Sequence, residues 1–467
     1  MLQTVFERQP PWPEVIRDSL ATTRHAPFWL DDLKDRPAYP SLPGDISTDL
    51  VIVGGGMVGL WSALLAKERF PDQQVILLEA RELVWAASGR NGGFCEASLT
   101  HGEKNGLRRW PEEYDTLYRM GIENLDEMAA TLEKYGIDCD FERTGEIVVA
   151  VEPHQVAELE GEGFLNQQQI QAEVNSPTFL AGHWDGSDTA MLNPAKLVFG
   201  LARVASALGV QIFEHSAVTD LKRGKDGSLQ LLTAHGKVAA QRAILATNVF
   251  PSVLKRYRLH TLPVYDYALM TAPLSEAQLK AIGWQNRQGL ADPANQFHYY
   301  RITRDNRILF GGYDALYYFG GKVKEEYDAR PASFERLASH FFTTFPQLEG
   351  LKFTHQWGGA IDTSTRFCAF FGDACGGRVA HAAGFTGLGV GASRFAANVL
   401  LDKVHGLDTE RTRLRMVRQK PLPFPPEPIA YPIVRLMQWC LDRADHNQGK
   451  RNWLLRTMDK LGLGFES

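Results

Sequence analysis

Cysteine is scarce in this sequence. Five cysteines occur in 467 residues, an odd number, and no two of them form a C-x-x-C pair. That pattern argues against a disulfide framework, against a zinc site and against the redox-active pair of a disulfide reductase. We therefore expect a protein of a reducing compartment, the cytoplasm, and no bound metal.

Long apolar runs and a strong excess of one charge are also missing. No stretch approaches the roughly 18 consecutive apolar residues of a membrane-spanning helix, and the N-terminus lacks the apolar core of a signal peptide. The net charge of −5 gives no reason to expect nucleic-acid binding. With 44% hydrophobic and 22% charged residues, the composition is that of an ordinary globular enzyme.

The strongest positive signal runs from Thr48 to Glu79. An apolar strand pattern ends in G-x-G-x-x-G, a helical pattern follows at once, and a second apolar strand ends at Glu79. This is the order of a dinucleotide-binding unit, in which glycines let a pyrophosphate approach the helix N-terminus and a carboxylate accepts hydrogen bonds from ribose. The segment predicts cofactor contacts at Gly54, Gly56, Met57, Val58, Gly59, Glu79 and Ala80.

Two further glycine-rich segments indicate which dinucleotide is bound. Residues 86–94 (AASGRNGGF) follow the second strand, and residues 384–391 (GFTGLGVG) lead into a helix. Flavin enzymes wrap such loops around the pyrophosphate and the isoalloxazine, and a helix N-terminus can stabilise the negative charge of a reduced flavin. A nicotinamide dehydrogenase needs neither segment. We therefore predict further FAD contacts at Ser88, Arg90, Asn91, Gly92, Gly93, Gly384, Phe385, Thr386, Gly387 and Leu388.

No second nucleotide motif accompanies the first. The glycines from Gly311 to Gly321 have the wrong spacing for NAD(P)H, and Gly372-Asp373 is interpreted as a turn rather than as the G-D motif of flavin hydroxylases. A flavin hydroxylase is therefore the weaker alternative. No Ser-His-Asp set, carboxylate pair or metal-ligand cluster stands out, which fits a reaction whose redox chemistry belongs to the flavin.

On these motifs the chain resembles the D-amino-acid oxidase-like family of FAD-dependent oxidoreductases. ILATN at 244–248, RILFGG at 307–312 and HAAGFTGLG at 381–389 extend the resemblance over nearly the whole chain. Gamma-glutamylputrescine oxidases and aminophosphonate oxidoreductases are the branches it looks most like. The resemblance implies an α/β fold, with a discontinuous Rossmann-like FAD-binding domain and a mixed-sheet substrate domain. It also implies cofactor contacts at Val218, to the adenine, and at Thr247.

The reaction implied by the resemblance is oxidation of the C–N bond of a small primary or secondary amine, such as an amino acid, a gamma-glutamyl amine or an aminophosphonate. Hydride passes from carbon to flavin, and the imine is hydrolysed to a carbonyl. Molecular oxygen or another acceptor then takes the electrons. Covalent relatives carry a linking histidine or cysteine where this chain has Ser88 to Gly93 and Trp357 to Gly359. We therefore expect noncovalent FAD.

The substrate pocket is expected at residues 296–303 (QFHYYRIT), where strand alternation separates Tyr300 from Tyr299 and Arg301. Relatives hold the acidic end of a substrate near here, so Tyr300 or Arg301 could do so, with core packing or an ion pair as the alternative. Because Arg301 lies outside the nucleotide-binding segments, its replacement is expected to leave flavin content unchanged. The predicted pocket residues are Tyr300, Arg301, Trp357 and His381, the last two with structural roles as alternatives.

Composition divides the chain into five segments. They are a lead-in at 1–47, an FAD-binding domain at 48–259 with part of 94–190 available to the substrate domain, a substrate domain at 260–355, a returning FAD-binding segment at 356–404, and a helical tail at 405–467. The proline-rich lead-in is expected to lie over the FAD-binding domain. In the tail, residues 433–441 and 453–463 mix large apolar residues with arginine and lysine. We expect the tail to pack back on the enzyme. The alternatives are that the tail binds a partner subunit, or that it lies on a membrane surface in a dehydrogenase that passes electrons to a membrane carrier.

Overall fold

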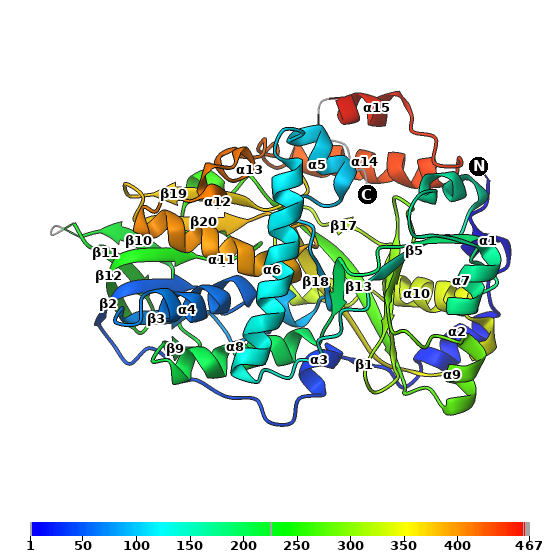
Figure 1. Cartoon of the computed structure of the whole chain (residues 1–467), viewed down its shortest axis with the longest axis horizontal. Coiled ribbons are helices and arrows are strands. Elements are labelled where there is room, and N and C mark those ends of the chain that lie inside the picture. The colour runs from blue at the N-terminus through cyan, green and yellow to red at the C-terminus, as the bar shows by residue number, and fades with distance from the viewer. Residues whose placement is uncertain (1, 225–226, 461, 463–467) are drawn as a thin grey trace.

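The structure is a computed structural model that describes residues 2–224, 227–460 and 462. Two β-sheets lie in different halves of the molecule, and helices pack against each of them (Figure 1). One sheet has a parallel centre and the other mixes parallel and antiparallel strands. The predicted α/β fold class is therefore confirmed.

The nucleotide-type sheet has the strand order β10–β11–β12–β2–β3–β9, with β20 beside β12 and β19 beside β20. The strands β12, β2, β3 and β9 run parallel, and β20 is parallel to β12. Their bounds are β2 Ile46–Val53, β3 Val75–Leu78, β9 Gln211–Phe213, β10 Asp220–Arg223, β11 Leu229–Thr233, β12 Gly236–Leu245, β19 Phe370–Ala374 and β20 Val379–Ala383.

Three apolar helices cover one face of this sheet: α4 (Met57–Arg69), α8 (Pro194–Ala207) and α11 (Gly389–His405). Because layers cover the central strands, β3 is buried at every position, as its unbroken apolar sequence predicts. Asn193 caps α8 by accepting hydrogen bonds from two backbone amides, and Pro194 occupies the first helical position. The long helix α6 (Tyr114–Tyr135) crosses the front of the molecule next to α11, after the short α5 (Glu103–Arg109).

The second sheet has the order β1–β18–β13–β16–β15–β14–β5–β7–β6, with β17 beside β13. The bounds are β1 Arg24–His25, β5 Glu146–Ala150, β6 Phe164–Asn166, β7 Ala181–Trp184, β13 Leu262–Thr271, β14 Gly289–Ala291, β15 His298–Ile302, β16 Ile308–Gly312, β17 Leu316–Tyr317 and β18 Phe353–Thr363. Residues from 94–190 thus enter this sheet. The boundary expected between 355 and 356 falls inside β18, so the returning segment begins beyond Thr363.

The lead-in is divided between the two halves of the molecule, and its first part packs on the second sheet. Phe6, in α1 (Val5–Arg8), stacks on the ring of His340 with 4.4 Å between centroids. Helix α2 (Pro13–Leu20) packs on α10 (Pro331–Thr344), and β1 pairs with β18. The second part lies on the FAD-binding half, where α3 (Phe28–Asp31) packs on α8 and the backbone amides of Tyr39 and Leu42 donate to Glu214 and Ser216, each at 2.9 Å. The remaining helices here are α7 Gln167–Glu173 and α9 Glu276–Ile282.

A two-stranded ribbon and the tail complete the fold. The ribbon pairs β4 (Phe94–Glu96) with β8 (Thr189–Met191). The tail comprises α12 Glu410–Arg413, α13 Arg415–Arg418, α14 Ala430–Asp445 and α15 Trp453–Lys460. Helices α14 and α15 lie along the upper edge in Figure 1, above the region between the two sheets. In the described ranges no helix has the length and apolar character needed to span a bilayer.

Candidate active site

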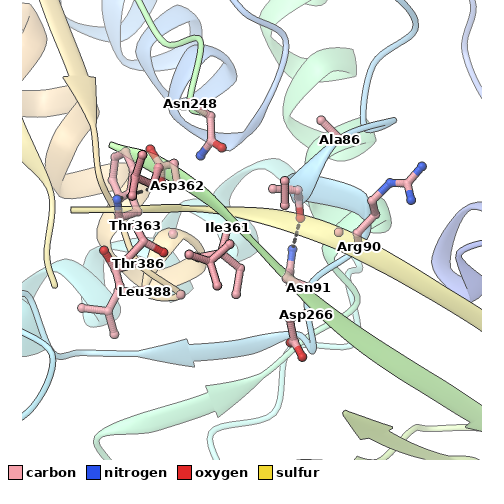
Figure 2. Close-up of a pocket in the computed structure, with 18 of the residues that line it drawn as sticks. Ala86, Arg90, Asn91, Asn248, Asp266, Ile361, Asp362, Thr363, Thr386 and Leu388 are labelled. Carbon is pink, nitrogen blue, oxygen red and sulfur yellow. Dashed lines mark hydrogen bonds between the residues drawn. The ribbon is translucent and has the colours of Figure 1, made fainter. Parts of the chain in front are cut away.

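Both sheets and the tail line a large cavity of about 810 Å³. Its walls come from the β2–α4 turn, the loop before β4, the strands β13, β15 and β18, the start of α11 and one face of α14. Figure 2 shows part of this lining. Asp266 lies just below Asn91, and Asp362 lies with Thr386 on the other side of Ile361.

The turn from β2 into α4 is shaped for close approach. Gly54 has a φ of +109°, and a Cβ there would lie 2.4 Å from the Ala246 carbonyl oxygen. A Cβ at Gly59 would lie 1.9 Å from the Gly54 carbonyl oxygen, so only glycine lets the helix pack this closely on the turn. Gly56 is the N-cap of α4 and supplies no side-chain cap. The positive end of the helix is therefore available to an anion in the cavity.

Glu79 follows β3 and lines the cavity beside this turn. Its carboxylate accepts hydrogen bonds from the backbone amides of Gly55, at 2.7 Å, and Arg81, at 2.9 Å. The indole Nε1 of Trp85 donates a third bond at 3.1 Å. These donors fix the orientation of the carboxylate, which retains lone pairs that can accept from the hydroxyls of a ribose.

The loop before β4 is braced from within and from the second sheet. Asn91 Nδ2 donates to the Ala87 carbonyl at 2.9 Å, and Asn91 Oδ1 accepts from the Gly93 amide at 2.9 Å. Arg90 Nη1 donates to Asp328 at 2.9 Å and to the Gly358 carbonyl at 2.8 Å. Trp29 and Trp357 donate from their indoles to the carbonyls of Asn91 and Arg90, each at 2.8 Å. The loop is thereby held in one position between the two sheets.

The start of α11 is held by a buried carboxylate at the end of β18. Asp362 accepts from the backbone amides of Gly384, at 2.5 Å, and Phe385, at 2.9 Å. Burial raises the pKa of Asp362 to about 7, against the opposing effect of these amides. Leu388, the N-cap of α11, supplies no side-chain cap. A second helix N-terminus therefore opens on the cavity, which Thr386, Gly387 and Leu388 line.

Most of the predicted cofactor residues lie on this cavity. Those that line it are Gly54, Gly56, Met57, Val58, Glu79, Ala80, Ser88, Arg90, Asn91, Gly92, Val218, Thr247, Phe385, Thr386, Gly387 and Leu388. Gly59, Gly93 and Gly384 lie behind the lining, where their missing side chains let neighbouring segments pack. A Cβ at Gly93, for example, would lie 2.2 Å from the Leu192 carbonyl oxygen.

The residues fit FAD on a structural ground as well. Thr247 Oγ1 is buried and has no hydrogen-bond partner in the described structure, although its residue lines the cavity. Two uncapped helix N-termini open on the same space. Such unmet donors and acceptors fit a ligand with phosphate and hydroxyl groups. The β2–α4 turn and Glu79 would hold the adenosine diphosphate part, and the braced loop and the start of α11 would hold the flavin.

The expected substrate-binding role of two residues of β15 is wrong in this structure. Tyr300 points into the core of the second sheet, where it packs on Phe310 and Phe345. Arg301 lies on the opposite face but is 1% exposed and does not line the cavity. Its Nη1 donates to the carbonyls of Gly93, at 3.1 Å, and Leu192, at 2.7 Å. Burial lowers the pKa of Arg301 to about 10.

Of the two remaining residues predicted for the pocket, one lies on the cavity and the other does not. Trp357 lines the cavity, and its indole holds the Arg90 carbonyl. His381 does not line it. The His381 ring stacks on Tyr257, and its Nδ1 lies 3.1 Å from the Leu245 carbonyl oxygen, so its role is structural. Burial lowers the pKa of His381 to about 4, which keeps the ring neutral at physiological pH.

Several residues of the lining were missed in the sequence. Tyr299, Asp266, Glu96 and Glu146 face the cavity from three strands of the second sheet and from β4. Asp266 is the one charged residue in the apolar pattern of β13, and Tyr299 shares the face of β15 that Arg301 occupies. These two features of the sequence could have indicated Asp266 and Tyr299 as residues of the lining. Burial raises the pKa of Asp266 to about 6, and the hydrogen bond from Tyr299 acts in the opposite direction.

The tail forms one wall of the cavity. Along α14, the lining residues recur at helical spacing on one face: Ala430, Ile433, Val434, Met437, Gln438 and Leu441. Asp445, at the end of the helix, accepts from the backbone amides of Asn295 and Gln296, both at 3.0 Å. Near its start, Glu427 accepts from the Tyr317 hydroxyl at 2.6 Å. The helix is therefore fixed over the cavity at both ends.

Comparisons with known proteins agree with this geometry. The family model described as DAO, FAD dependent oxidoreductase, matches residues 49–403. Gamma-glutamylputrescine oxidoreductase of Escherichia coli strain K12 is 30% identical over 403 residues, covering 80% of this chain and 87% of that protein. Probable oxidoreductase OrdL of Haemophilus influenzae is 28% identical, covering 82% and 89%. The crystal structure of glycine oxidase from Geobacillus kaustophilus superposes with a TM-score of 0.64 at 17% identity, covering 78% and 96%.

Proposed function

The chain belongs to the DAO family of FAD-dependent oxidoreductases, and on that premise we propose that it oxidises the C–N bond of a small primary or secondary amine. One observation carries the proposal. The cavity that the cofactor residues line continues, without a break in its lining, to Asp266, Tyr299 and Trp357 of the second sheet. A substrate on those side chains lies next to the cofactor. The relatives that act on a gamma-glutamyl amine and on glycine support the same class of reaction.

The reaction is balanced as a two-electron oxidation. FAD, when bound, accepts a hydride from the carbon next to nitrogen, and the amine becomes an imine that water hydrolyses to a carbonyl and ammonia or a smaller amine. Molecular oxygen or another acceptor then takes the two electrons. No metal enters the scheme.

The side chains of the chain position the reactants. The loop before β4 fixes the cofactor side of the cavity, and α14 restricts the access of bulk water to the cavity. An ammonium group must lose a proton before its carbon can give up a hydride. A Cβ at Gly92 would lie 2.8 Å from the ring of Tyr299, whose hydroxyl donates to Asp266. Asp266 therefore lies close to the loop before β4, and it can hold the amine and accept that proton.

Anaerobic mixing tests this proposal directly. The purified yellow protein is mixed without oxygen with a panel of amines, amino acids and aminophosphonates, and the visible absorbance of the flavin is followed. At least one C–N compound should bleach the flavin and yield a carbonyl product. If 2-hydroxy acids bleach the flavin and none of the nitrogen compounds does so, the proposed amine oxidation is overturned.

The outer face of α14 supports a second candidate, a dehydrogenase that delivers electrons at a membrane surface. Ile429, Leu436 and Trp439 are 54%, 47% and 51% exposed, and Trp453 of α15 is 73% exposed. Arg435 and Arg443 flank this apolar stripe. Helices with such a face bind at the lipid headgroup boundary. Cosedimentation with anionic vesicles, compared between the parent and Leu436→Ser/Trp439→Ser, tests it. Equal sedimentation of both would count against this candidate.

We further propose a cytoplasmic location. All five cysteines are free thiols, three of them in the main hydrophobic core. Free buried thiols fit a reducing compartment. A functional fusion with a reporter that is active only in the cytoplasm would test the location.

A further inference from the structure

The lining of the cavity is acidic. In the described structure six carboxylates line it and one guanidinium, that of Arg90, with His101 as the other basic residue and no lysine. The carboxylates are Glu79, Glu96, Glu146, Asp266, Asp314 and Asp362. This balance is the reverse of what an acidic substrate needs.

Half of these carboxylates have partners that account for their charge. Glu79 and Asp362 accept from backbone amides at the two cofactor loops. Asp314 forms ion pairs with Arg330, at 2.9 Å, and Arg336, at 2.5 Å. The guanidinium of Arg90 is engaged as well, with Asp328 and the Gly358 carbonyl. In the described structure an anionic substrate would therefore find no available guanidinium in the lining, and burial lowers the pKa of His101 to about 4, which leaves that ring uncharged at neutral pH.

Glu96 and Glu146 form an acidic pair with no such compensation. The hydrogen bonds and ion pairs of the described residues include none to either carboxylate, and both residues are half-buried and line the cavity. Desolvation raises the pKa of Glu96 to about 7 and also raises the pKa of Glu146, and the negative charge of Asp185 acts on both in the same direction. Partly desolvated carboxylates placed next to each other are costly when both are charged, and a cation between them would remove much of that cost.

The cation that fits is organic. Across the described ranges no group of three histidine, cysteine, aspartate or glutamate side chains is placed to hold a metal ion. Two or three carboxylates facing an apolar-walled cavity match the geometry of an alkylammonium group, whose three N–H donors need acceptors. The apolar residues of α14 offer contact to its hydrocarbon chain.

Asp266 is a second, separate negative position. Its carboxylate accepts from the Tyr299 hydroxyl at 2.7 Å, and the charge that most affects it is Asp314 rather than the glutamate pair. It lies by the Asn91–Gly92 loop, on the cofactor side. The cavity thus offers carboxylates to a cation at two places.

We propose that the substrate is an amine with two cationic nitrogens, one held at Asp266 and the other at Glu96 and Glu146. This inference rests on the proposed amine oxidation and narrows its substrate class to diamines and related dications. It runs against amino acids and aminophosphonates. A carboxylate or phosphonate in this lining would be repelled, while a single ammonium would leave one acidic position unpaired.

The test uses the FAD-loaded enzyme and three compounds of equal chain length: 1,4-diaminobutane, butylamine and 4-aminobutanoate. Dissociation constants come from the change in flavin absorbance on mixing, and reduction rates come from anaerobic stopped flow. We expect the diamine to bind about 10- to 100-fold more tightly than butylamine, the effect of one charge-assisted contact. Binding of 4-aminobutanoate should be the weakest. A series from 1,3-diaminopropane to 1,6-diaminohexane should show a length optimum.

Substitutions of the two glutamates test whether they bind the second cationic nitrogen. Glu146→Gln and Glu96→Gln should each narrow the ratio of diamine to butylamine affinity by about tenfold or more, since each removes a charge-assisted contact. The matched control is Glu142→Gln, because Glu142 is four residues away, pairs with Arg287 at 2.9 Å and lies outside the lining. That variant should keep the parent ratio. Thermal melts of all three check folding.

The outcomes separate this inference from the proposed function. If butylamine and 1,4-diaminobutane both reduce the flavin and bind with equal affinity, the proposal of a dicationic substrate is overturned while amine oxidation stays in place. Tighter binding of 4-aminobutanoate than of the diamine would overturn it in the same way. An unchanged affinity ratio in both glutamine variants would also overturn it. Absence of flavin reduction by every amine would refute the proposed function itself, and binding measured from the absorbance change would still report the charge preference.

Discussion

Tyr299 donates a hydrogen bond to Asp266 over 2.7 Å, and it reaches across the strand that lies between them. β16 separates β15 from β13, and Gly311 sits in register with Tyr299 on one side and Ala268 on the other. A Cβ at Gly311 would lie 2.6 Å from Tyr299 Cζ. The missing side chain therefore lets the phenol lie flat on the sheet and meet the carboxylate. The pair depends on three strands at once.

Removal of this hydrogen bond should change the pH dependence of the reaction. Asp266 binds a cation as the carboxylate, so kcat/KM should rise as pH rises through about 6, the raised pKa of this group. The Tyr299 bond favours the carboxylate. Tyr299→Phe should therefore move the acidic limb to higher pH. The control is Tyr300→Phe, since Tyr300 points into the core, and pH profiles from pH 5 to 9 provide the measurement. An unmoved limb in Tyr299→Phe would show that another group titrates there.

The raised pKa of Asp266 also predicts how this group changes the stability of the protein with pH. The folded protein binds this proton more tightly than the unfolded chain, where an aspartate titrates at about 4. The contribution of this group is thus fully present below about pH 4 and is lost as pH rises to about 6. Asp266→Asn should raise Tm by a few degrees at pH 7.5 and give no gain at pH 4. A lower Tm at both pH values would contradict this account.

Arg301 should matter for the cofactor and not for the charge of the substrate. Its guanidinium holds the Gly93 and Leu192 carbonyls behind the loop before β4. Arg301→Ala leaves these acceptors and the loop unsupported, so the variant should retain FAD several-fold less well than the parent on dilution. This differs from the unchanged flavin content that the sequence alone predicts. Arg304→Ala is the matched control, because Arg304 is 51% exposed at its side chain and pairs with Asp138. FAD fluorescence after gel filtration gives the measurement.

FAD should be released on acid precipitation, since it is expected to be held without a covalent bond. The supernatant should carry the flavin absorbance, and colour in the washed pellet would refute noncovalent binding. As a companion, Gly56→Val should abolish FAD retention. A Cβ at Gly56 would lie 2.8 Å from Ser88 Oγ, at the N-terminus of α4 that the pyrophosphate needs. Circular dichroism of the variant checks that it is folded.

The attachment of α14 can be tested through Asp445. Asp445→Ala removes the acceptor for the Asn295 and Gln296 amides, so the end of the helix should open more often and limited proteolysis should cut the tail several-fold faster. Asp442→Ala is the control on the same helix, since Asp442 pairs locally with His446. Equal cleavage rates in the two variants would show that this contact does not hold the helix.

The sequence was sufficient for the cofactor half because its signals are local. Gly54, Gly56 and Glu79 act through the backbone of one contiguous βαβ unit, so spacing alone places them. The substrate half depends on which strands become neighbours. Alternation in β15 separated Tyr299 from Tyr300 correctly, but only the order of β13, β16 and β15 shows that Tyr299 meets Asp266. Arg301 was misassigned because its nearest acceptors come from residues 93 and 192, which no pattern in residues 296–303 reveals.

The contacts of Arg90 connect the cofactor side of the molecule to the second sheet. One side chain ties the cofactor loop to Asp328 and to the carbonyl of Gly358, and two tryptophans fasten the same loop to α3 and β18. Rotation of one sheet against the other would break all of these bonds together. Opening and closing of two lobes would therefore be a costly route of entry for a substrate. Helix α14 covers the cavity from the tail and is held by contacts at its two ends, so we expect exchange with solvent to depend on how often α14 detaches.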